Sequence, residues 1–259
     1  MITSTSNPKA KHLLQLQKKG RVRREEGVFI AEGYRMFQET PRDRIAEVYV
    51  SEAFRQKEGE RLEMDGLRLE VLADHVFSYA AGTMTPQGIL CVVKMREYSP
   101  EEVIGGGKPH ILVMDNLQDP GNVGTILRTA EGAGVTGIIL SRDCVDIYNP
   151  KVIRATMGSI YRVPFAYVDD LEAAVGQLKG KGIRTFAAHL EGQHSYECED
   201  YTGGTAFLLG NEGNGLRKEI AELADCRIQI PMQGEVESLN VAIAASVLMF
   251  EAARQRRRK

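Results

Sequence analysis

Three polar loops hold the side chains best suited to chemistry, and each loop follows an apolar run of the sequence. The first loop spans residues 115 to 122 and leads into a helical pattern, on which Arg128 lies opposite the apolar stripe. The stripe consists of Val123, Ile126, Leu127 and Ala130. A ligand could bind at this strand end, near Arg128, while Asn122 could cap the helix. A cap and a solvent-facing arginine explain the pattern equally well, so both interpretations stay open.

The second loop is rich in glycine and reads LGNEGNGL at residues 209 to 216. Glycines at the end of an apolar strand let backbone amides approach a ligand closely. Glu212 lies among these glycines, and an acidic side chain is an unusual choice for a mere turn. The alternative is a flexible connection, and the composition favours a binding site.

The third loop precedes a long apolar helix. From Leu239 to Phe250 only Asn240 and Ser246 are polar, which predicts a helix buried nearly all round. A buried Asn240 needs a hydrogen-bond partner, and a ligand could supply one. Ser238 is the expected N-cap of this helix.

A fourth glycine pattern imitates a dinucleotide-binding fingerprint. Gly132, Gly134 and Gly137 have the G-x-G-x-x-G spacing, but a helical pattern precedes them and a strand pattern follows. The fingerprint requires the reverse order, because the amides at the start of a helix must face the pyrophosphate. Gly134 therefore reads better as the C-terminal cap of the helix.

The elements that position these loops follow from the hydrophobic pattern beyond residue 109. Apolar runs alternate with helical periodicity, which predicts an α/β fold with a parallel sheet covered on both faces. The expected strands span residues 111–114, 137–140, 185–188, 206–209 and 227–230. The expected helices span residues 122–133, 170–178, 217–224 and 238–254. Ligands of such sheets bind at the carboxyl ends of the strands, where all three loops begin.

The preceding residues predict a smaller domain of mixed helices and strands. A basic helix is expected at residues 8–19, an apolar run at 28–31, and strands at 47–50 and 88–93. Turn formers and charges mark residues 98–108 as a linker. The expected domains are therefore residues 1–97 and 109–259.

Composition excludes several classes of protein. Of the 259 residues 43% are hydrophobic and 26% are charged, as in a globular chain, and the net charge of −2 favours no class of partner. No apolar run reaches the length of a membrane helix, and the start has no apolar signal core. The four cysteines lie far apart without a CxxC pair, so neither a zinc knuckle nor a disulfide framework is expected. We expect a reduced, cytoplasmic protein without a membrane partner.

Positive charge gathers locally at both ends of the chain. Eight Lys or Arg residues and three Glu residues lie between Asn7 and Arg35, and the chain ends RQRRRK. Such clusters could neutralise nucleic-acid phosphates. The alternative, which charge alone favours, is a solvated helix face and a frayed tail.

Taken together, the three loops resemble in order the motifs of the SpoU class of RNA ribose 2′-O-methyltransferases, the TrmH-like branch of the trefoil-knotted methyltransferases. The motifs read NVGTILR at 122–128, LGNEGNGL at 209–216, and IPM at 230–232 with SLNVA at 238–242. NPKVIR at 149–154 and RVP at 162–164 also fit, so the resemblance spans residues 111–256. Earlier segments, NPK at 7–9, GVFIAEG at 27–33 and QGI at 87–89, resemble a small ribosomal-protein-like RNA-binding domain.

The resemblance implies a parallel sheet with a deep C-terminal trefoil knot, preceded by a small α+β RNA-binding domain. It implies S-adenosylmethionine as methyl donor, S-adenosylhomocysteine as product, no metal, and an obligate homodimer whose active site draws on both subunits. The implied catalytic residues are Arg128, Asn122, Glu212, Ser238 and Asn240. The implied cofactor-binding residues are Leu209, Gly210, Asn211, Ile230, Met232, Leu239 and Asn240. The expected RNA-binding residues are Lys9, Lys18, Lys19, Arg21, Arg23, Arg24 and Arg154.

The extra N-terminal domain favours ribosomal RNA over transfer RNA by analogy with the family. No DNA partner is expected. The alternatives are a transfer-RNA 2′-O-methyltransferase, a non-catalytic RNA-binding relative of the same fold, and a nucleotide-dependent oxidoreductase that uses the glycine pattern at 132–137. The presence of Asn122, Arg128, Glu212 and Asn240 argues against a non-catalytic relative. A site that no longer catalyses a reaction would be free to lose these residues.

Overall fold

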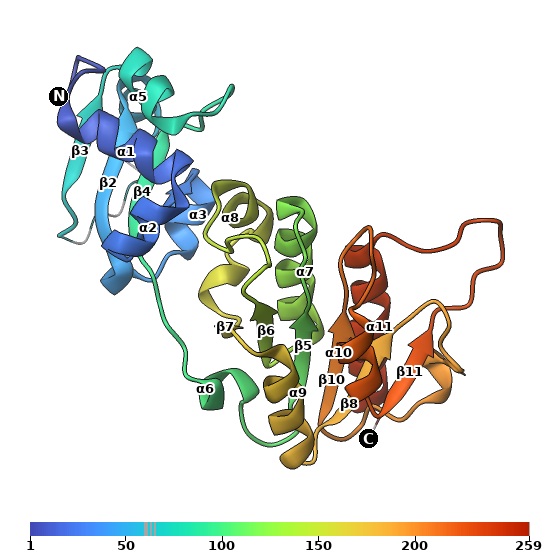
Figure 1. Cartoon of the computed structure of the whole chain (residues 1–259). Coiled ribbons are helices and arrows are strands. Elements are labelled where there is room, and N and C mark those ends of the chain that lie inside the picture. Colours follow the sequence, from blue (N-terminus) through green and yellow to red (C-terminus); the bar gives the residue numbers. More distant parts are fainter. Residues whose placement is uncertain (60–61, 63, 65, 259) are drawn as a thin grey trace. The chain divides into compact units, whose positions relative to one another are not determined.

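A computed structural model describes residues 1–59, 62, 64 and 66–258 (Figure 1). Its contacts divide the chain into two compact units. The first unit combines residues 1–96 with 146–161, and the second combines residues 97–145 with the chain from residue 162 onward. This differs from the contiguous division expected from the sequence, because residues 146–161 leave the second unit's sheet between two of its strands and belong to the first unit.

The first unit has a four-stranded mixed sheet in the order β1-β4-β2-β3. Its strands are β1 (Val28–Glu32), β2 (Ile45–Ser51), β3 (Leu69–Leu72) and β4 (Ile89–Lys94). Its helices are α1 (Pro8–Lys18), α2 (Gly20–Glu26), α3 (Tyr34–Glu39), α4 (Glu52–Glu58), α5 (Asp74–Ala81) and α8 (Pro150–Thr156), with short 3-10 turns at Arg42–Arg44 and Ser159–Tyr161. Leu13 and Leu16 of α1 and Phe77 of α5 are buried in one core with Tyr49 of β2. The expected basic helix and both expected strands are present.

Segment 146–161 is tied to the first unit by buried polar contacts. Arg23 of α2 is only 3% exposed; it donates to the carbonyl of Leu16 at 2.7 Å and pairs with Asp146 at 2.5 Å. Tyr161 accepts a hydrogen bond from the Thr40 hydroxyl at 2.8 Å. The expectation that Arg23 contacts RNA is therefore wrong, because its guanidinium is buried and already binds this segment.

The second unit has a seven-stranded sheet in the order β7-β6-β5-β10-β8-β11-β9, and every pair is parallel. Its strands are β5 (His110–Met114), β6 (Gly137–Ser141), β7 (Phe165–Val168), β8 (Arg184–Ala188), β9 (His194–Ser195), β10 (Thr205–Leu209) and β11 (Cys226–Gln229). β5, β6 and β10 are buried along their whole length, which explains their continuous apolar runs. The expected α/β class is confirmed, and β7 and β9 are two strands that the pattern did not predict.

Helices cover both faces of this sheet (Figure 1). They are α6 (Pro100–Ile104), α7 (Pro120–Ala133), α9 (Leu171–Gly180), α10 (Lys218–Leu223) and α11 (Val241–Arg257), with a 3-10 turn at Tyr196–Cys198. α6, α9 and α10 share one apolar core with alternate residues of the central strands, such as Ile111 and Val113. α7 and α11 pack against each other on the opposite face. None of the described helices has both the length and the apolar character needed to cross a bilayer.

Residues 98–108, expected as a linker, are packed into the second unit. α6 begins with a capping box, in which the side chains of Ser99 and Glu102 each accept from the other's backbone amide. Val103 and Ile104 are buried in the core. A Cβ at Gly137 would lie 1.8 Å from the carbonyl oxygen of Val103, so β6 has a glycine where α6 crosses it. Two apolar residues thus anchor a segment whose glycines and charges suggest a free linker.

The glycine pattern at 132–137 has structural causes. Gly134 ends α7 in the left-handed conformation with φ of 75°, as predicted, and β6 follows the helix. The dinucleotide fingerprint is therefore ruled out by the order of the elements.

Arg254, Arg256 and Arg257 belong to α11 instead of a frayed tail, Arg258 is its C-cap, and Lys259 lies outside the described residues. Arg256 donates to the carbonyls of Tyr201, Pro109 and Gly203 at 2.7–3.0 Å. Arg254 pairs with Glu251 at 2.6 Å. The Arg254 pair lies within α11, whereas the contacts of Arg256 fasten this last helix to the residues just before β5 and β10.

Candidate functional site

The carboxyl ends of β5 and β10 adjoin at the middle of the sheet. Met114 and Leu209 are paired in register, and the amide of Asp115 donates to the carbonyl of Leu209 at 2.9 Å. From β5 the sheet continues through β6 to β7, whereas the strands beyond β10 lie on its other side. Open parallel sheets bind ligands outside such a reversal of strand order. The first and second loops leave the sheet at this point.

Asp115 locks the first loop to the second. Its side chain is 1% exposed and accepts from the Nε and Nη2 atoms of Arg217 at 2.9 and 2.6 Å. The backbone amide of Arg217 also donates to it, at 3.2 Å. A buried carboxylate with an arginine partner on the neighbouring loop fixes the spacing of the two loops.

The glycine-rich loop is a compact turn closed by Asn211 and Gly215, whose backbones exchange two hydrogen bonds of 2.9 Å. The Asn211 Oδ1 atom accepts from the amides of Gly213 and Asn214, and its Nδ2 atom donates to the carbonyl of Asn116 at 2.7 Å. These hydrogen bonds give the loop a defined conformation, so it is not the flexible connection that was the alternative interpretation of the sequence.

Gly210 explains the first glycine of this turn. A Cβ there would lie 1.9 Å from the backbone nitrogen of Leu216. Gly210 therefore lets the loop cross over its own backbone. The sequence suggests that the glycines let a ligand approach the backbone. At Gly210, however, the close approach is between two parts of the loop's own backbone.

Glu212 accepts hydrogen bonds across the two loops. Asn122 Nδ2 donates to it at 3.1 Å, and the amides of Asp119 and Gln118 donate at 3.2 and 3.3 Å. Partial burial opposes ionisation, but these donors and its own backbone amide outweigh burial and lower the pKa of Glu212. Glu212 is therefore an ionised acceptor at neutral pH.

Asn122 connects Glu212 to the third loop. Its Oδ1 atom accepts from Asn240 Nδ2 at 3.0 Å while its Nδ2 atom donates to Glu212. The polar chain Glu212–Asn122–Asn240 thus contains one residue from each of the three sequence motifs. Because both ends of the Asn122 amide are engaged, its orientation is fixed.

Two expected helix caps are wrong. Asp119 caps α7 by accepting from the amide of Asn122 at 2.8 Å, and Pro120 occupies the first helical position. Asn240 caps α11 by accepting from the amides of Ala242 and Ile243, so the helix starts at Val241 and Ser238 lies before it.

Two expectations about burial are also wrong. Asn240 is exposed, and its partners are protein groups. α11 is not enclosed on all sides, since Ile243 is 51% and Phe250 46% exposed.

Other expected site residues stay outside the polar chain. Arg128 and Ser238 are exposed, and their side chains form no hydrogen bond or ion pair with the residues that the structure describes. Leu209 is buried, whereas Ile230, Met232 and Leu239 are half-buried along the connection from β11 to α11. The structure therefore joins Asn122, Glu212 and Asn240 directly and leaves Arg128 available to a group outside this chain.

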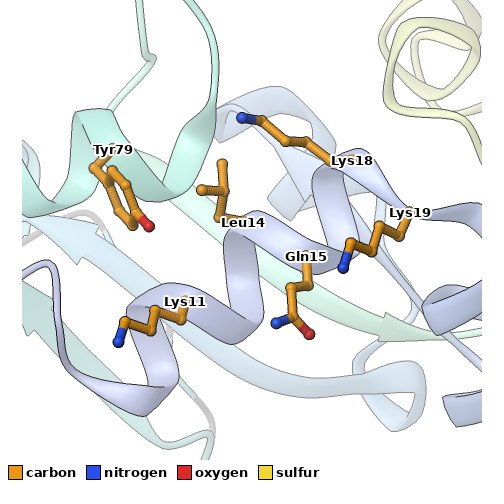
Figure 2. A pocket seen from close by; sticks show the side chains of 6 residues that line it. All are labelled: Lys11, Leu14, Gln15, Lys18, Lys19 and Tyr79. Carbon is orange, nitrogen blue, oxygen red and sulfur yellow. The ribbon is translucent and has the colours of Figure 1, made fainter.

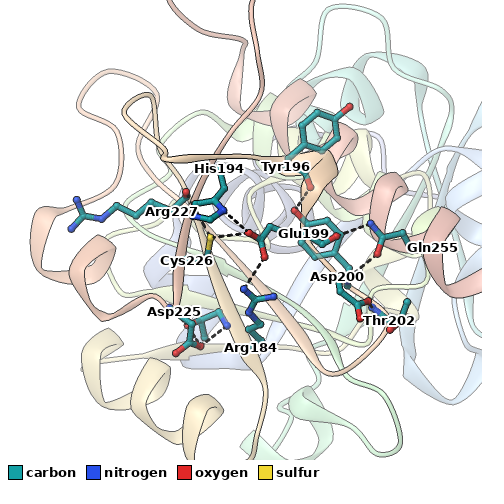
Figure 3. A network of polar contacts seen from close by, with 12 residues as sticks. Arg184, His194, Tyr196, Glu199, Asp200, Thr202, Asp225, Cys226, Arg227 and Gln255 are labelled. Carbon is teal, nitrogen blue, oxygen red and sulfur yellow. Dashed lines mark hydrogen bonds and ion pairs between the residues drawn. The ribbon is translucent and has the colours of Figure 1, made fainter.

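A cluster of possible metal ligands lies at the edge of the sheet, around Glu199 (Figure 3). Glu199 binds Arg184 at 2.7 Å, His194 at 3.0 Å and the Cys226 thiol at 3.5 Å. Burial, followed by the charge of Glu199, raises the pKa of Cys226 to about 11, so the thiol stays protonated at neutral pH. The Glu199 carboxylate already has a guanidinium and a protonated thiol as partners. The cluster therefore links neighbouring strands.

The basic residues of the first unit fall into paired and unpaired groups. Lys9 pairs with Glu70, and Arg21 with Glu25. Lys18, Lys19 and Arg24 are exposed, and their side chains have no hydrogen-bond or ion-pair partner in the described chain; Arg154 is half-buried. The sequence did not single out Lys11 or Tyr79, which line a pocket of about 280 Å³ together with Lys18 and Lys19 (Figure 2). The sequence feature that could have indicated this pocket is the spacing of Lys11 and Lys18, which lie two turns apart on α1.

Comparisons with known proteins agree with this geometry. Residues 109–250 match the SpoU rRNA Methylase family, and residues 7–91 match the MRM3-like substrate binding domain. An uncharacterized tRNA/rRNA methyltransferase of Synechocystis is 34% identical over 98% of this chain and 93% of its own length. The 23S rRNA (guanosine(2553)-2′-O)-methyltransferase RlmP of Bacillus subtilis is 31% identical over 96% of this chain and 97% of its own. A crystal structure of an AdoMet-bound rRNA methyltransferase from Sinorhizobium meliloti is 30% identical, covers 98% of this chain and 97% of its own, and has a TM-score of 0.85.

Proposed function

Because the chain belongs to the SpoU rRNA methylase family, we propose that it transfers a methyl group from S-adenosylmethionine to a ribose 2′-hydroxyl of ribosomal RNA. The observation that carries this proposal is the polar chain Glu212–Asn122–Asn240, which joins all three motifs beside the reversal of strand order. The names of the relatives and their methyl-donor complex support the same chemistry.

The connection from β11 to α11, which leads to Asn240, suits S-adenosylmethionine. Ile230, Met232 and Leu239 offer half-buried apolar surface to an adenosine, and the ionised Glu212 adds negative charge near a sulfonium ligand. Leu209, Gly210, Asn211 and Asn240 complete the proposed binding set. When bound, the cofactor supplies a methyl group on a good leaving group, so the protein's task is alignment.

Arg128 is the residue we assign to the ribose and its phosphate. A guanidinium can bind the phosphate through two hydrogen bonds and stabilise negative charge as it develops on the attacking oxygen. We assign it no role as a base, because an arginine in a protein is hard to deprotonate. Glu212, Asn122 and Asn240 are positioning residues in this scheme, and Ser238 contacts the substrate from the third loop.

We further propose that the active unit is a homodimer. Ile243 and Phe250 lie two turns apart on α11 and form an exposed apolar strip beside α7. A Cβ at Gly132 of α7 would lie 3.9 Å from Phe250, so both helices contribute to this face. Thr125, Arg128 and Gly132 are all exposed on α7. A second copy covering this strip would bring the Arg128 of one protomer toward the site of the other.

Ribosomal RNA is preferred to transfer RNA as substrate. One relative that matches this chain nearly end to end is named as a 23S rRNA enzyme. Another long relative is named for either RNA, which keeps a transfer-RNA activity as the second candidate. With either RNA as substrate we place the protein in the cytoplasm.

The direct test supplies purified protein and radiolabelled S-adenosylmethionine with protein-free ribosomal RNA or with transfer RNA. We expect label in ribosomal RNA at one nucleotide that resists alkaline cleavage, as a 2′-O-methylated ribose does. Label in transfer RNA alone would support the second candidate. Binding of the cofactor without label in either RNA would favour a non-catalytic RNA-binding relative.

A further inference from the structure

The pocket of the first unit lies in the groove between α1 and α5. Its lining consists of Lys11, Leu14, Gln15, Lys18, Lys19 and Tyr79. Figure 2 shows Tyr79 and Leu14 at the same opening, with the lysines around them. The side chains come from α1, its C-cap Lys19, and α5; α1 and α5 pack on each other, so the groove is formed by the fold of this unit alone.

Buried residues pack α1 and α5 together beneath the groove. Leu13 and Leu16 on α1 are completely buried, and Ala80 on α5 is buried with them. Gly82 ends α5 with φ of +63°, and a Cβ there would lie 3.6 Å from Leu14. The helices therefore hold Leu14 and Tyr79 at a fixed separation, and a ligand would find the surface already formed.

The charge of the pocket is uncompensated. Lys11, Lys18 and Lys19 are exposed and form no ion pair with the described residues, and no carboxylate lines the pocket. Nearby basic residues behave differently, since Lys9 pairs with Glu70 and His12 contacts Glu26. Three free ammonium groups around one opening favour an anionic ligand.

The aromatic ring distinguishes this opening from a simple basic patch. Tyr79 is 38% exposed and Leu14 is half-buried beside it. An unstacked nucleobase gains free energy by stacking on such a ring, while lysines bind the adjoining phosphates. A base inside a duplex is already stacked and has no free face to offer.

We propose that this pocket binds one unpaired nucleotide of the RNA substrate, with its base against Tyr79 and its phosphates at Lys11, Lys18 and Lys19. This inference rests on the proposed function for the identity of the substrate. It adds that the first unit selects a single-stranded position, such as a loop or bulge, by stacking one base.

Fluorescence tests the stacking directly, because the chain contains no tryptophan. Tyr79→Trp places a single tryptophan in the pocket of the full-length protein. We expect a short unstructured oligouridylate to quench its emission, and a fully paired RNA duplex to leave it unchanged. The matched control is Tyr34→Trp on α3, whose ring contacts Phe37 and Phe54, and its emission should not respond. Equal quenching of both variants, no quenching, or quenching by polyglutamate would overturn the proposal.

Affinity provides the second measurement. Tyr79→Ala should weaken binding of the oligouridylate about fivefold to 100-fold, the range that removal of a stacked aromatic gives, and Tyr79→Phe should retain it. Changing Lys11, Lys18 and Lys19 to Gln should lower the slope of log K against log salt by about 2. Lys57→Gln on α4, an exposed lysine outside the pocket, is the charge control. Full affinity in Tyr79→Ala would refute the pocket.

Methyl transfer separates the two proposals. Tyr79→Ala should raise the KM for ribosomal RNA and leave kcat unchanged at saturating RNA. If wild-type protein methylates ribosomal RNA and Tyr79→Ala has the same KM, the pocket fails while the proposed function stands. If wild-type protein methylates no RNA, the proposed function fails, and the fluorescence result still decides whether the pocket binds a nucleotide.

Discussion

Asn122→Asp is the change that probes the polar chain most sharply. The substitution preserves shape and the oxygen that accepts from Asn240, but replaces the donor 3.1 Å from Glu212 by a second carboxylate oxygen. Two unit charges at that separation repel by about 1.3 kcal/mol in water and about 5 kcal/mol at an effective dielectric constant of about 20. Because Glu212 is exposed, we expect about 1–3 kcal/mol, with about 1 kcal/mol more for the lost hydrogen bond.

A favourable effect opposes this repulsion. Residue 122 lies in the first turn of α7, where a negative charge gains about 0.3–1 kcal/mol from the helix dipole. Repulsion and the lost hydrogen bond exceed this gain, so Asn122→Asp should destabilise the second unit by about 1–3 kcal/mol. For a unit of this size we expect its melting temperature at pH 8 to fall by about 2–10 °C.

The pH dependence identifies the cause. In the wild type the folded-state pKa of Glu212 is lowered, so its contribution to stability is present above the ordinary pKa of about 4.3 and is lost as the pH falls through the folded value. In Asn122→Asp, mutual repulsion raises the pKa of one carboxyl above the unfolded value. The deficit should therefore be largest at pH 8 and shrink as the pH approaches 5.

Thermal unfolding at pH 5 and pH 8, together with methyl transfer at each pH, measures this effect. Asn122→Ala removes the hydrogen bonds without adding charge, and its deficit should not shrink on acidification. Asn214→Asp adds a negative charge to the same exposed loop, where the native side chain makes no described hydrogen bond, and should leave stability nearly unchanged. If Asn122→Asp is as stable as wild type at pH 8, or equally impaired at both pH values, the electrostatic reasoning is refuted.

Three further changes test separate parts of the account. Arg128→Ala should lower methyl transfer about 100- to 1000-fold, with cofactor affinity by calorimetry and mass by light scattering unchanged; wild-type turnover would refute the assignment. Arg23→Ala leaves a partly buried carboxylate without its partner and should destabilise the first unit by about 3 kcal/mol in denaturant unfolding, whereas the exposed Arg24→Ala should cost less than about 0.5 kcal/mol. Gly210→Ala places a methyl group 1.9 Å from backbone and should abolish cofactor binding, while Gly213→Ala, whose nearest neighbour is 3.6 Å away, should retain it; equal binding by both would contradict the packing of the loop.

The central sheet could be predicted because its strands are buried on both faces. β5, β6 and β10 appear in the sequence as uninterrupted apolar runs, and helical periodicity separates them. β7 is half-exposed along most of its length and β9 has two residues, so neither leaves such a run. Strand order depends on contacts between distant segments, which no local pattern contains.

Most residues of the site could be predicted from the sequence, but several of their structural roles could not. Asp119 before Pro120 is itself a strong start signal for α7, and it shows that Asn122 was free for another task. Asn240 and Ser238 are both residue types that cap helices well. Asn240 is the one that caps α11, and it also contacts Asn122, which is 118 residues away in the sequence. Arg23 looked like one more surface charge because its partner Asp146 is 123 residues away.

The pattern of ribose methylation in cellular ribosomal RNA shows whether the three motif loops form one site for methyl transfer. We would map 2′-O-methyl groups at nucleotide resolution in cells lacking this protein, and again after restoring either the wild type or Asn122→Asp. We expect that one ribose loses its methyl group, regains it with the wild type, and stays largely unmethylated with the variant. An unchanged map in the deleted cells, or full restoration by the variant, would contradict it.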